Sequence, residues 1–397
     1  DVSDTNYHLP VCDAFIDACA EAGFRTTDDF NGADQEGCGY FQVTQTPEGK
    51  RANSSTSFLD PVENRSNLVI LKKTHVTRVL FDECGESPAA CGVEIYNARK
   101  GIRESLLARE VIISAGVINS PQILKLSGIG PSAELEKHGI RVVKDLPGVG
   151  ENLRDHYGTR LTARAKNVKT INELARGPKL VGEIAKYFLG RRSILELGPT
   201  LVYCFWHSDE TVRNADLQVS FTPASYKEGL QAWLDDEPGF TLATWQQRPE
   251  SLGYVRAKSS DPFAKPLIQP NYLDHEEDRR VLLAGIKLSR RLMNTEPLAP
   301  YFDYEGYPGT HIQNDDELLD VARQRSTTVY HLMGTCRMAP ATDPTGVVDD
   351  QLRVHGMQNL RVIDASIMPT MLSANLNAGV LMIAEKGADM VLGKPPL

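Results

Sequence analysis

The sequence predicts a mixed α/β fold with two domains, one built around buried strands and the other combining an antiparallel sheet with helices. The chain has 397 residues, enough for two packed domains with a substantial core. Its content of 41% hydrophobic and 24% charged residues is that of an ordinary globular protein. Segments with helical spacing of apolar residues alternate along the chain with short apolar runs typical of strands.

The first elements follow from local patterns. The segment VCDAFIDACAEAG has apolar residues at helical spacing and ends at Gly23, which predicts a helix with a glycine stop. Three β-rich runs follow, separated by turn signals: NLVILKK, VTRVLFDE and CGVEIYNA. The run EVIISAG is almost wholly apolar and leads into a helical segment, SPQILKLSG. This order predicts a buried central strand, a tight turn and a helix.

The middle of the chain, roughly residues 157–325, predicts a second domain. Its helical segments are KLVGEIAKYFLG and RRVLLAGIKLSRRLM, and its strand-like runs are DLQVSFTP, FTLATWQQ and YVRAKS. After Arg325 the chain returns to the first domain with the strand NLRVIDAS and the helix AGVLMIAEKGADMVLGK, which Gly393 and Pro395 stop. Open α/β sheets bind nucleotides at strand carboxyl ends and helix amino ends.

The charge and hydropathy of the chain exclude several partner classes. The net charge is −9 and there is no long basic run, so the chain has no electrostatic footprint for nucleic acid and should be repelled by anionic lipid surfaces. No apolar run of eighteen residues is present, so we expect no membrane span. A small-molecule ligand is the remaining expectation.

The seven cysteines are scattered, without a C-x-x-C pair or a metal-like cluster, so we expect no metal site. Their odd number argues against a full disulfide framework. Cys84 and Cys91 flank a predicted hairpin turn and could pair in an oxidising compartment. Reduced thiols in the cytoplasm are favoured over that pairing, and a cytoplasmic location is predicted, with secretion left open.

The stretch TVYHLMGTCRM places His331 among apolar and small residues. A lone histidine in such surroundings is most simply a partly buried core residue that bonds a backbone carbonyl. A second stretch, SANLNAG, and a family resemblance change that interpretation.

Four stretches, in order, resemble the glucose-methanol-choline (GMC) flavin oxidoreductases. They are GVINSPQILKLSGIG, LPGVGENLRDH, RPESLGYVRAKSSDPFAKPLIQPNYL and a carboxyl-terminal block that contains YHLMGTCRM, VVDDQLRVHGMQNLRVIDASIMPT and NLNAGVLMIAEKGADM. The chain departs from the family pattern at Val117, where a small residue is usual, and at Leu252, where arginine is common.

The resemblance implies a Rossmann-like FAD-binding domain, residues 50–155 and 338–397, and a substrate-binding domain, residues 1–49 and 156–337. The strand and G-x-G-x-x-G turn with which the family opens, and which hold the FAD pyrophosphate, have no counterpart here. The expected match is therefore to the carboxyl-terminal two-thirds of the family. An upstream segment or a companion chain is expected to carry the missing turn.

The resemblance also implies which residues contact FAD. Val76 matches a residue whose backbone contacts the adenine ring, and Asp364 and Ala365 match residues beside the ribityl and pyrophosphate chain. Asn377 matches a residue near the pyrimidine edge of the flavin. A helix starting at Ala378 would direct its positive end at that edge and favour the anionic reduced flavin. An alternative for Asp364 is a helix cap or turn residue.

Alcohol oxidation needs a base near the hydroxyl, and imidazole suits that role. His331 matches the family's catalytic histidine and Asn375 its partner, which can hydrogen-bond the substrate oxygen. Tyr330 is expected to line the pocket, with a core tyrosine as the alternative. The predicted function is oxidation of a primary alcohol (aryl, furanic or choline-like) to the aldehyde, with oxygen or a quinone-like electron acceptor. A hydroxynitrile lyase and a non-catalytic fragment or subunit are the alternatives.

Overall fold

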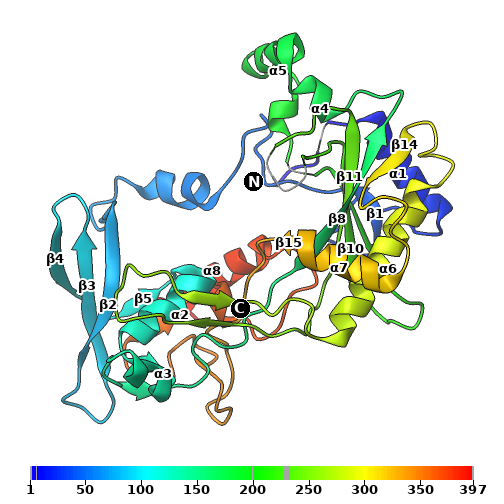
Figure 1. Cartoon of the computed structure of the whole chain (residues 1–397). Helices are drawn as coiled ribbons and strands as arrows, with labels where there is room; N and C mark the ends of the chain where they lie inside the picture. Colours follow the sequence, from blue (N-terminus) through cyan, green and yellow to red (C-terminus); the bar gives the residue numbers. More distant parts are fainter. Residues whose placement is uncertain (1, 6, 199, 228–232, 396–397) are drawn as a thin grey trace. The chain divides into compact units, whose positions relative to one another are not determined.

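The computed structural model describes residues 2–5, 7–198, 200–227 and 233–395, and the chain divides into two compact units (Figure 1). Unit 1 comprises Asp1–Val69, Tyr157–Gln247 and Glu277–Thr327, and unit 2 comprises Ile70–His156, Arg248–Glu276 and Thr328–Leu397. The predicted mixed α/β class is confirmed. The assignment of FAD binding and substrate binding to separate domains stays a prediction.

Unit 1 is built on one seven-stranded sheet in the order β1-β9-β10-β11-β8-β14, with β15 beside β8. The strands are β1 (Gly37–Tyr40), β8 (Tyr157–Ala165), β9 (Val202–Trp206), β10 (Leu217–Thr222), β11 (Gly239–Gln246), β14 (Phe302–Tyr307) and β15 (Thr327–Thr328). The neighbours from β1 to β14 are antiparallel, as predicted for the second domain. The predicted strands DLQVSFTP and FTLATWQQ are the central pair β10 and β11.

Two long helices cover one face of this sheet. The unit's helices are α1 (Pro10–Glu21), α4 (Ile171–Leu174), α5 (Gly177–Phe188), α6 (Glu276–Met293) and α7 (Asp315–Arg325), with short turns at Ser55–Leu59, Asp60–Val62 and Ile194–Glu196. Phe15 of α1 stacks on Phe221 of β10, with ring centroids 4.5 Å apart. Gly285 of α6 lies so close to the sheet that a Cβ there would be 2.8 Å from Leu217. Since Leu217 and Phe221 lie on the same face of β10, α1 and α6 pack on that face.

Unit 2 contains several small sheets. Its strands are β2 (Thr74–Asp82), β3 (Ala89–Asn97), β4 (Ile102–Leu107), β5 (Val111–Ile113), β6 (Ile129–Gly130), β7 (Lys144–Asp145), β12 (Tyr254–Arg256), β13 (Leu267–Gln269) and β16 (Leu360–Val362). Its helices are α2 (Gly116–Leu126), α3 (Ser132–Lys137), α8 (Asn377–Val391) and the short turn Ala365–Ile367. Strands β5 and β16 pair in parallel, and the helices α2 and α8 follow them. The predicted strand–helix pairs EVIISAG–SPQILKLSG and NLRVIDAS–AGVLMIAEKGADMVLGK are confirmed.

The prediction for NLVILKK is wrong. The residues 67–73 form no strand, and Val69 and Leu71 are exposed. Lys73 has φ +57°, a left-handed conformation that interrupts an extended backbone just before β2 begins at Thr74. The three-stranded sheet is completed instead by β4, which was not predicted.

A large apolar core holds the site-bearing segments of unit 2. It joins Leu124 of α2, Ile113 of β5 and Val362 of β16 to the segment that contains Met333 and Cys336. This core therefore holds together, within unit 2, the segment that follows β15 and the segment that follows β16. Among the described residues, no helix combines the length and the apolar character needed to span a bilayer.

Candidate active site

His331 is positioned by two stretches of backbone that pair with each other. Arg154 and Met333 exchange hydrogen bonds, with N···O distances of 3.1 and 2.9 Å, and the Val329 N–H donates to the His156 carbonyl at 2.9 Å. The end of the LPGVGENLRDH stretch therefore runs beside the YHLMGTCRM stretch. This pairing places His331 next to His156 although 175 residues separate them.

Both ring nitrogens of His331 meet a polar side chain. Its Nδ1 is 2.9 Å from Nδ1 of His156, which is fully buried, and its Nε2 is 3.2 Å from Nδ2 of Asn375. Burial lowers the pKa of His331 to about 4. The ring is therefore neutral at physiological pH, as a general base must be before it accepts a proton. The predicted pair His331 and Asn375 is in contact.

Asp155 holds the backbone at His331. One carboxylate oxygen accepts the His331 backbone N–H at 2.9 Å, and the other accepts the Tyr272 hydroxyl at 2.5 Å. Burial raises the pKa of Asp155, and the hydrogen bonds that it accepts oppose that rise. Asp155 bonds the main chain of His331, so it fixes the position of the residue and leaves the ring contacts to His156 and Asn375.

Tyr330 has an unusual backbone conformation. Its φ is +62°, and its N–H donates to the Thr328 hydroxyl at 2.8 Å. A left-handed conformation is uncommon for an aromatic residue, and such strain clusters at functional sites. The Tyr330 side chain is 73% exposed in this structure. Its predicted role in lining the pocket stays a prediction.

Asp364 connects the end of β16 to α2. Its Oδ1 accepts the Ser366 N–H at 2.8 Å, which caps the short turn Ala365–Ile367. Its Oδ2 accepts the Gly116 N–H at 2.9 Å and the Ser120 hydroxyl at 2.5 Å. Asp364 is thus a cap in this structure, and its contact with a cofactor stays a prediction. The carbonyl of the adjacent Ala365 accepts the Gly334 N–H at 3.2 Å.

The other predicted FAD contacts lie on β2 and α8. Val76 pairs with Ile95 across β2 and β3, and the ladder is irregular between Val76 and Arg78. Helix α8 begins at Asn377 without a side-chain cap, and Asn377 and Ala378 are exposed. Its first amide groups can therefore meet an anionic ligand edge, which is the property that the pyrimidine end of a flavin requires. Asn375 lies two residues before this helix start, so the uncapped end and the His331 contact lie close together in the chain.

Sequence reasoning did not single out His156 and Asp155, the two residues whose contacts position His331. Both lie in LPGVGENLRDH, which was interpreted only as part of the family resemblance. The signal available was the adjacent Asp-His pair at the end of that stretch, since acidic and imidazole side chains are the usual partners of a catalytic histidine.

The fold also gathers three cysteines that the sequence scatters. The Sγ atoms of Cys19, Cys38 and Cys204 lie within 4.8 Å of one another in unit 1, and all three residues are buried. Burial raises the pKa of the Cys19 and Cys38 thiols, which favours their protonated form. All seven cysteines, including Cys84 and Cys91, are free. The prediction that the chain holds no metal stays a prediction.

Two family models, both described as GMC oxidoreductase, match the chain at residues 1–158 and 249–384. The expectation that the resemblance is confined to the carboxyl-terminal two-thirds of the family is therefore corrected, because the amino-terminal model matches from the first residue. A companion chain that carries the G-x-G-x-x-G turn has no support in these matches.

Relatives are similar over the whole chain. The chain is 39% identical to an alcohol dehydrogenase (acceptor) of Pseudomonas putida, over 99% of this chain and 70% of the relative. It is also 39% identical to the mitochondrial choline dehydrogenase of Homo sapiens, over 100% of this chain and 66% of the relative. The chain thus spans about two thirds of the length of these relatives.

Solved structures share the fold. The chain superimposes on pyridoxine 4-oxidase from Mesorbium loti with a TM-score of 0.85 at 26% identity, covering 100% of this chain and 72% of that one. It matches an R554K variant of Aspergillus oryzae RIB40 formate oxidase, studied for its FAD modification, with a TM-score of 0.87 at 26% identity, covering 99% and 72%. The family match and these similar structures confirm the expectations that the chain is an oxidoreductase and that its cofactor is FAD. The chain belongs to the GMC oxidoreductase family of flavoproteins.

Proposed function

We propose that the protein oxidises a primary alcohol to the aldehyde, with His331 as the base that takes the hydroxyl proton. The observation that carries this proposal is the His331–Asn375 contact on a ring whose pKa burial lowers to about 4. A buried, neutral imidazole beside an amide donor is suited to accept a proton from an alcohol and to hold its oxygen.

The hydrogen-bond directions support a particular tautomer. Because the Asn375 amide nitrogen is a donor, Nε2 of His331 is assigned as the acceptor and carries the lone pair. The hydrogen of His331 is then on Nδ1 and is donated to Nδ1 of His156. When His331 takes a second proton at Nε2, this bond becomes charge-assisted and stabilises the imidazolium.

The alcohol is expected to enter between Nε2 of His331 and the amide of Asn375. Its hydroxyl would replace the amide as the partner of Nε2, and the amide N–H would then donate to the alcohol oxygen. Asp155 and the Tyr272 hydroxyl keep the backbone of His331 in place during this exchange. The charge that develops on the oxygen as the proton leaves is thereby met by a positioned donor.

FAD, when bound, supplies the acceptor for the hydride that leaves the alcohol carbon. We assign its pyrimidine edge to the start of α8 at Asn377 and Ala378, where uncapped amides are exposed. Val76, Asp364 and Ala365 are proposed to contact the adenine and the ribityl–pyrophosphate chain.

The substrate is proposed to be an aryl, furanic or choline-like primary alcohol. Relatives named choline dehydrogenase and alcohol dehydrogenase support the class of alcohol. The electron acceptor is proposed to be oxygen or a quinone-like compound, and one relative is named an oxygen-dependent choline dehydrogenase, from Acinetobacter baumannii.

The test is rapid anaerobic mixing of the FAD-loaded protein with choline, benzyl alcohol, a furanic alcohol and glucose. We expect flavin bleaching with at least one of the first three and a lower kcat/KM for glucose. A preference for glucose would overturn the substrate proposal. Release of cyanide from a cyanohydrin without bleaching by any alcohol would identify a lyase instead. Absence of both reactions would overturn the proposed function and favour a non-catalytic protein.

A further inference from the structure

Helix α5 of unit 1 presents an apolar face to solvent. Val181, Ile184 and Phe188 follow one another at spacings of three and four residues, so they share one face of the helix. Their exposed fractions are 65%, 38% and 81%, and Leu189 at the helix end is 71% exposed. An amphipathic helix of a globular protein normally turns such a face toward the core.

The side of α5 that faces the protein holds a buried glutamate between half-buried apolar side chains. Glu183 is only 3% exposed and accepts the Ile194 N–H at 3.0 Å, while the Ser193 hydroxyl donates to the Glu183 carbonyl at 2.9 Å. Leu180 and Tyr187 share this side of the helix and are half-buried, so α5 is held to unit 1 through both polar and apolar side chains. The second apolar face, at Val181, Ile184 and Phe188, stays exposed and requires an explanation, because contiguous exposed apolar side chains mark interaction sites.

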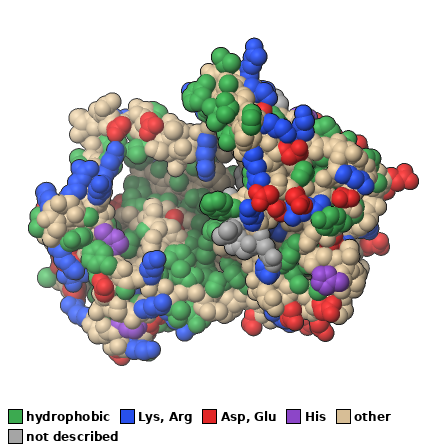
Figure 2. Space-filling model, turned by 45° about the horizontal axis from the view of Figure 1, so that its top comes forward, with side chains coloured by type: hydrophobic (Ala, Val, Ile, Leu, Met, Phe, Trp, Pro, Cys, Tyr) green, Lys and Arg blue, Asp and Glu red, His purple; other side chains and the backbone are tan. Residues whose placement is uncertain are grey.

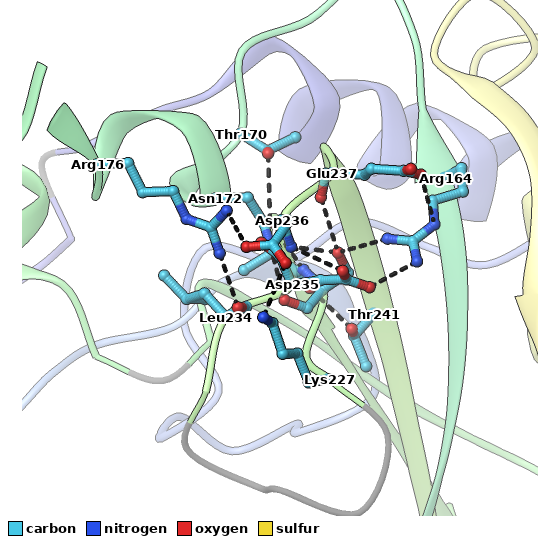
Figure 3. Close-up of polar contacts among 12 residues, drawn as sticks. Arg164, Thr170, Asn172, Arg176, Lys227, Leu234, Asp235, Asp236, Glu237 and Thr241 are labelled. Carbon is cyan, nitrogen blue, oxygen red and sulfur yellow. Dashed lines mark hydrogen bonds and ion pairs between the residues drawn. The ribbon is translucent and has the colours of Figure 1, made fainter.

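The base of α5 is anchored, as Figure 3 shows. Arg176, which directly precedes the helix, donates to Asp236 at 2.5 Å and to the Leu234 carbonyl at 2.9 Å. Asn172 of α4 is buried and donates to the carbonyls of Ser225 and Asp235 at 2.8 and 3.0 Å. These bonds tie α4 and α5 to the connection between β10 and β11, so the apolar face is displayed on a fixed support.

Cations surround the apolar face of α5. The residues 176–192 contain five basic side chains and one acidic one, Glu183, although the whole chain has a net charge of −9. Figure 2 shows hydrophobic and basic side chains together at the top of the molecule, where Figure 1 places α5.

Three of the cations around α5 reach outward beyond their acidic partners. Lys186 is 50% exposed and its partner Glu183 is 3% exposed; Arg192 is 51% exposed and its partner Glu196 is 12% exposed. Lys179 is 50% exposed and its partner Glu173 is 26% exposed. Arg176 at the base of the helix is the exception, since it is 37% exposed and its partner Asp236 is 67% exposed. The outermost charge along the helix and just beyond its end is therefore positive.

We propose that α5 binds the interface of a bilayer that contains anionic lipid. Val181, Ile184, Phe188 and Leu189 would enter the boundary between headgroups and acyl chains, and the flanking lysines and arginines would meet lipid phosphates. A second copy of the chain fits this surface less well, because a two-fold contact would bring the same cations face to face. The net negative charge of the whole chain opposes long-range attraction, so binding should require direct contact by α5.

Vesicle flotation tests this proposal on the intact, FAD-loaded protein. We expect binding to phosphatidylcholine vesicles that contain phosphatidylglycerol, weaker binding to phosphatidylcholine alone, and release from the mixed vesicles by salt. Binding is measured from flavin and protein content, so the result does not depend on the proposed catalytic activity. Absence of binding to the mixed vesicles would overturn the proposal.

Matched variants separate the role of α5 from general surface effects. Phe188→Asp should weaken binding by roughly tenfold or more, because it removes the most exposed apolar side chain and adds a negative charge. Leu107→Asp makes a comparable change at an 82% exposed site on β4 of unit 2 and should leave binding unchanged. Equal losses in the two variants would contradict a specific role for α5.

The charge contribution has its own pair of variants. Lys179→Gln should reduce binding to the mixed vesicles and have little effect on binding to phosphatidylcholine. Lys287→Gln on α6, where the lysine is 55% exposed and paired with Asp315, is the control and should change neither. A protein that fails to bind vesicles but forms a dimer that Phe188→Asp dissociates would show that a second copy covers the face, which would also overturn the proposal.

Discussion

His331 and His156 meet through their Nδ1 atoms at 2.9 Å, with ring planes at 85° to each other. A contact between two imidazole nitrogens holds one hydrogen, so one ring donates and the other accepts. Since Asn375 donates to Nε2 of His331, the donor in the contact is His331. His156 thus receives a hydrogen bond that would strengthen if His331 took up a second proton, as proposed above.

His331→Ala should lower the rate of flavin reduction by about 10²- to 10⁴-fold, because it removes the proposed general base. Bound FAD should be retained. Rapid mixing with substrate, paired with a melting curve, provides the measurement. A loss of melting temperature with a normal rate of flavin reduction per folded molecule would show that His331 is only a core residue.

Asn375→Ala should have a smaller effect, of about tenfold, because it removes one hydrogen bond to the oxygen and leaves the proton acceptor in place. The same rapid-mixing experiment measures it. Equal losses for Asn375→Ala and His331→Ala would contradict the assignment of the larger contribution to the imidazole.

His156→Leu should slow flavin reduction by about tenfold to hundredfold, because a hydrogen bond to a charged group contributes about 1.5–3 kcal/mol. The low-pH limb of the rate profile should also move to lower pH, since the imidazolium loses its acceptor. His156→Asn keeps an acceptor at the corresponding atom and should recover most of the rate. A purely structural role for His156 would leave the pH profile in place in both variants.

The depressed pKa of His331 predicts a defined pH dependence. The ring should remain a base as pH falls from 7 toward 5, so the rate should decline only as pH approaches 4. The folded-state pKa lies below the ordinary value of about 6.5, so the unfolded chain binds the proton first. The corresponding stability is present above pH about 6.5 and is lost as pH falls to about 4.

The contribution of His331 to the free energy of unfolding is roughly 3 kcal/mol. Melting curves of the native protein and of His331→Asn between pH 7 and pH 4 isolate this contribution, because the variant lacks the titrating ring. Parallel pH dependences in the two proteins would contradict the assigned pKa.

Gly285→Ala should destabilise unit 1 by about 1–3 kcal/mol through overpacking. An added Cβ would lie 2.3 Å from Oγ1 of Thr244 and 2.8 Å from Leu217, both on the sheet that α6 covers. Gly182→Ala in α5 is the control: its Cβ would meet nothing within 4 Å, and it should stabilise the helix by about 0.5–1 kcal/mol. Denaturant unfolding measures both, and equal changes would refute the close approach of α6.

Local patterns predicted the elements on which the site is built. The apolar runs that became β5 and β16, and the glycine stops after α1 and α8, depend on a few neighbouring residues, and the sequence displays them directly. The apolar residues of the segment 67–73 predict a strand, and that prediction is wrong. Val69 and Leu71 do not pack in the structure, and the left-handed conformation of Lys73 interrupts the extended backbone.

The contact between His331 and His156 could be identified only from the three-dimensional structure. His156 contacts His331 across 175 residues, and the cysteine cluster joins a helix to two strands. No periodicity in the sequence encodes such distances. Family resemblance supplied Asn375, whereas the hydrogen bonds that Gly116 and Ser120 donate to Asp364 became visible only once β16 lay beside β5.

The parallel pairing of β5 with β16 has a consequence during synthesis. Val111 lies opposite Leu360, so β5 leaves the ribosome about 250 residues before its partner. At about 5–20 residues per second, the nascent chain spends tens of seconds with β5 and its apolar neighbours unpaired. Completion of unit 2 is therefore a late event that follows translation of the carboxyl-terminal segment, and a ribosome that stalls before Leu360 leaves a chain suited to capture by chaperones or proteases.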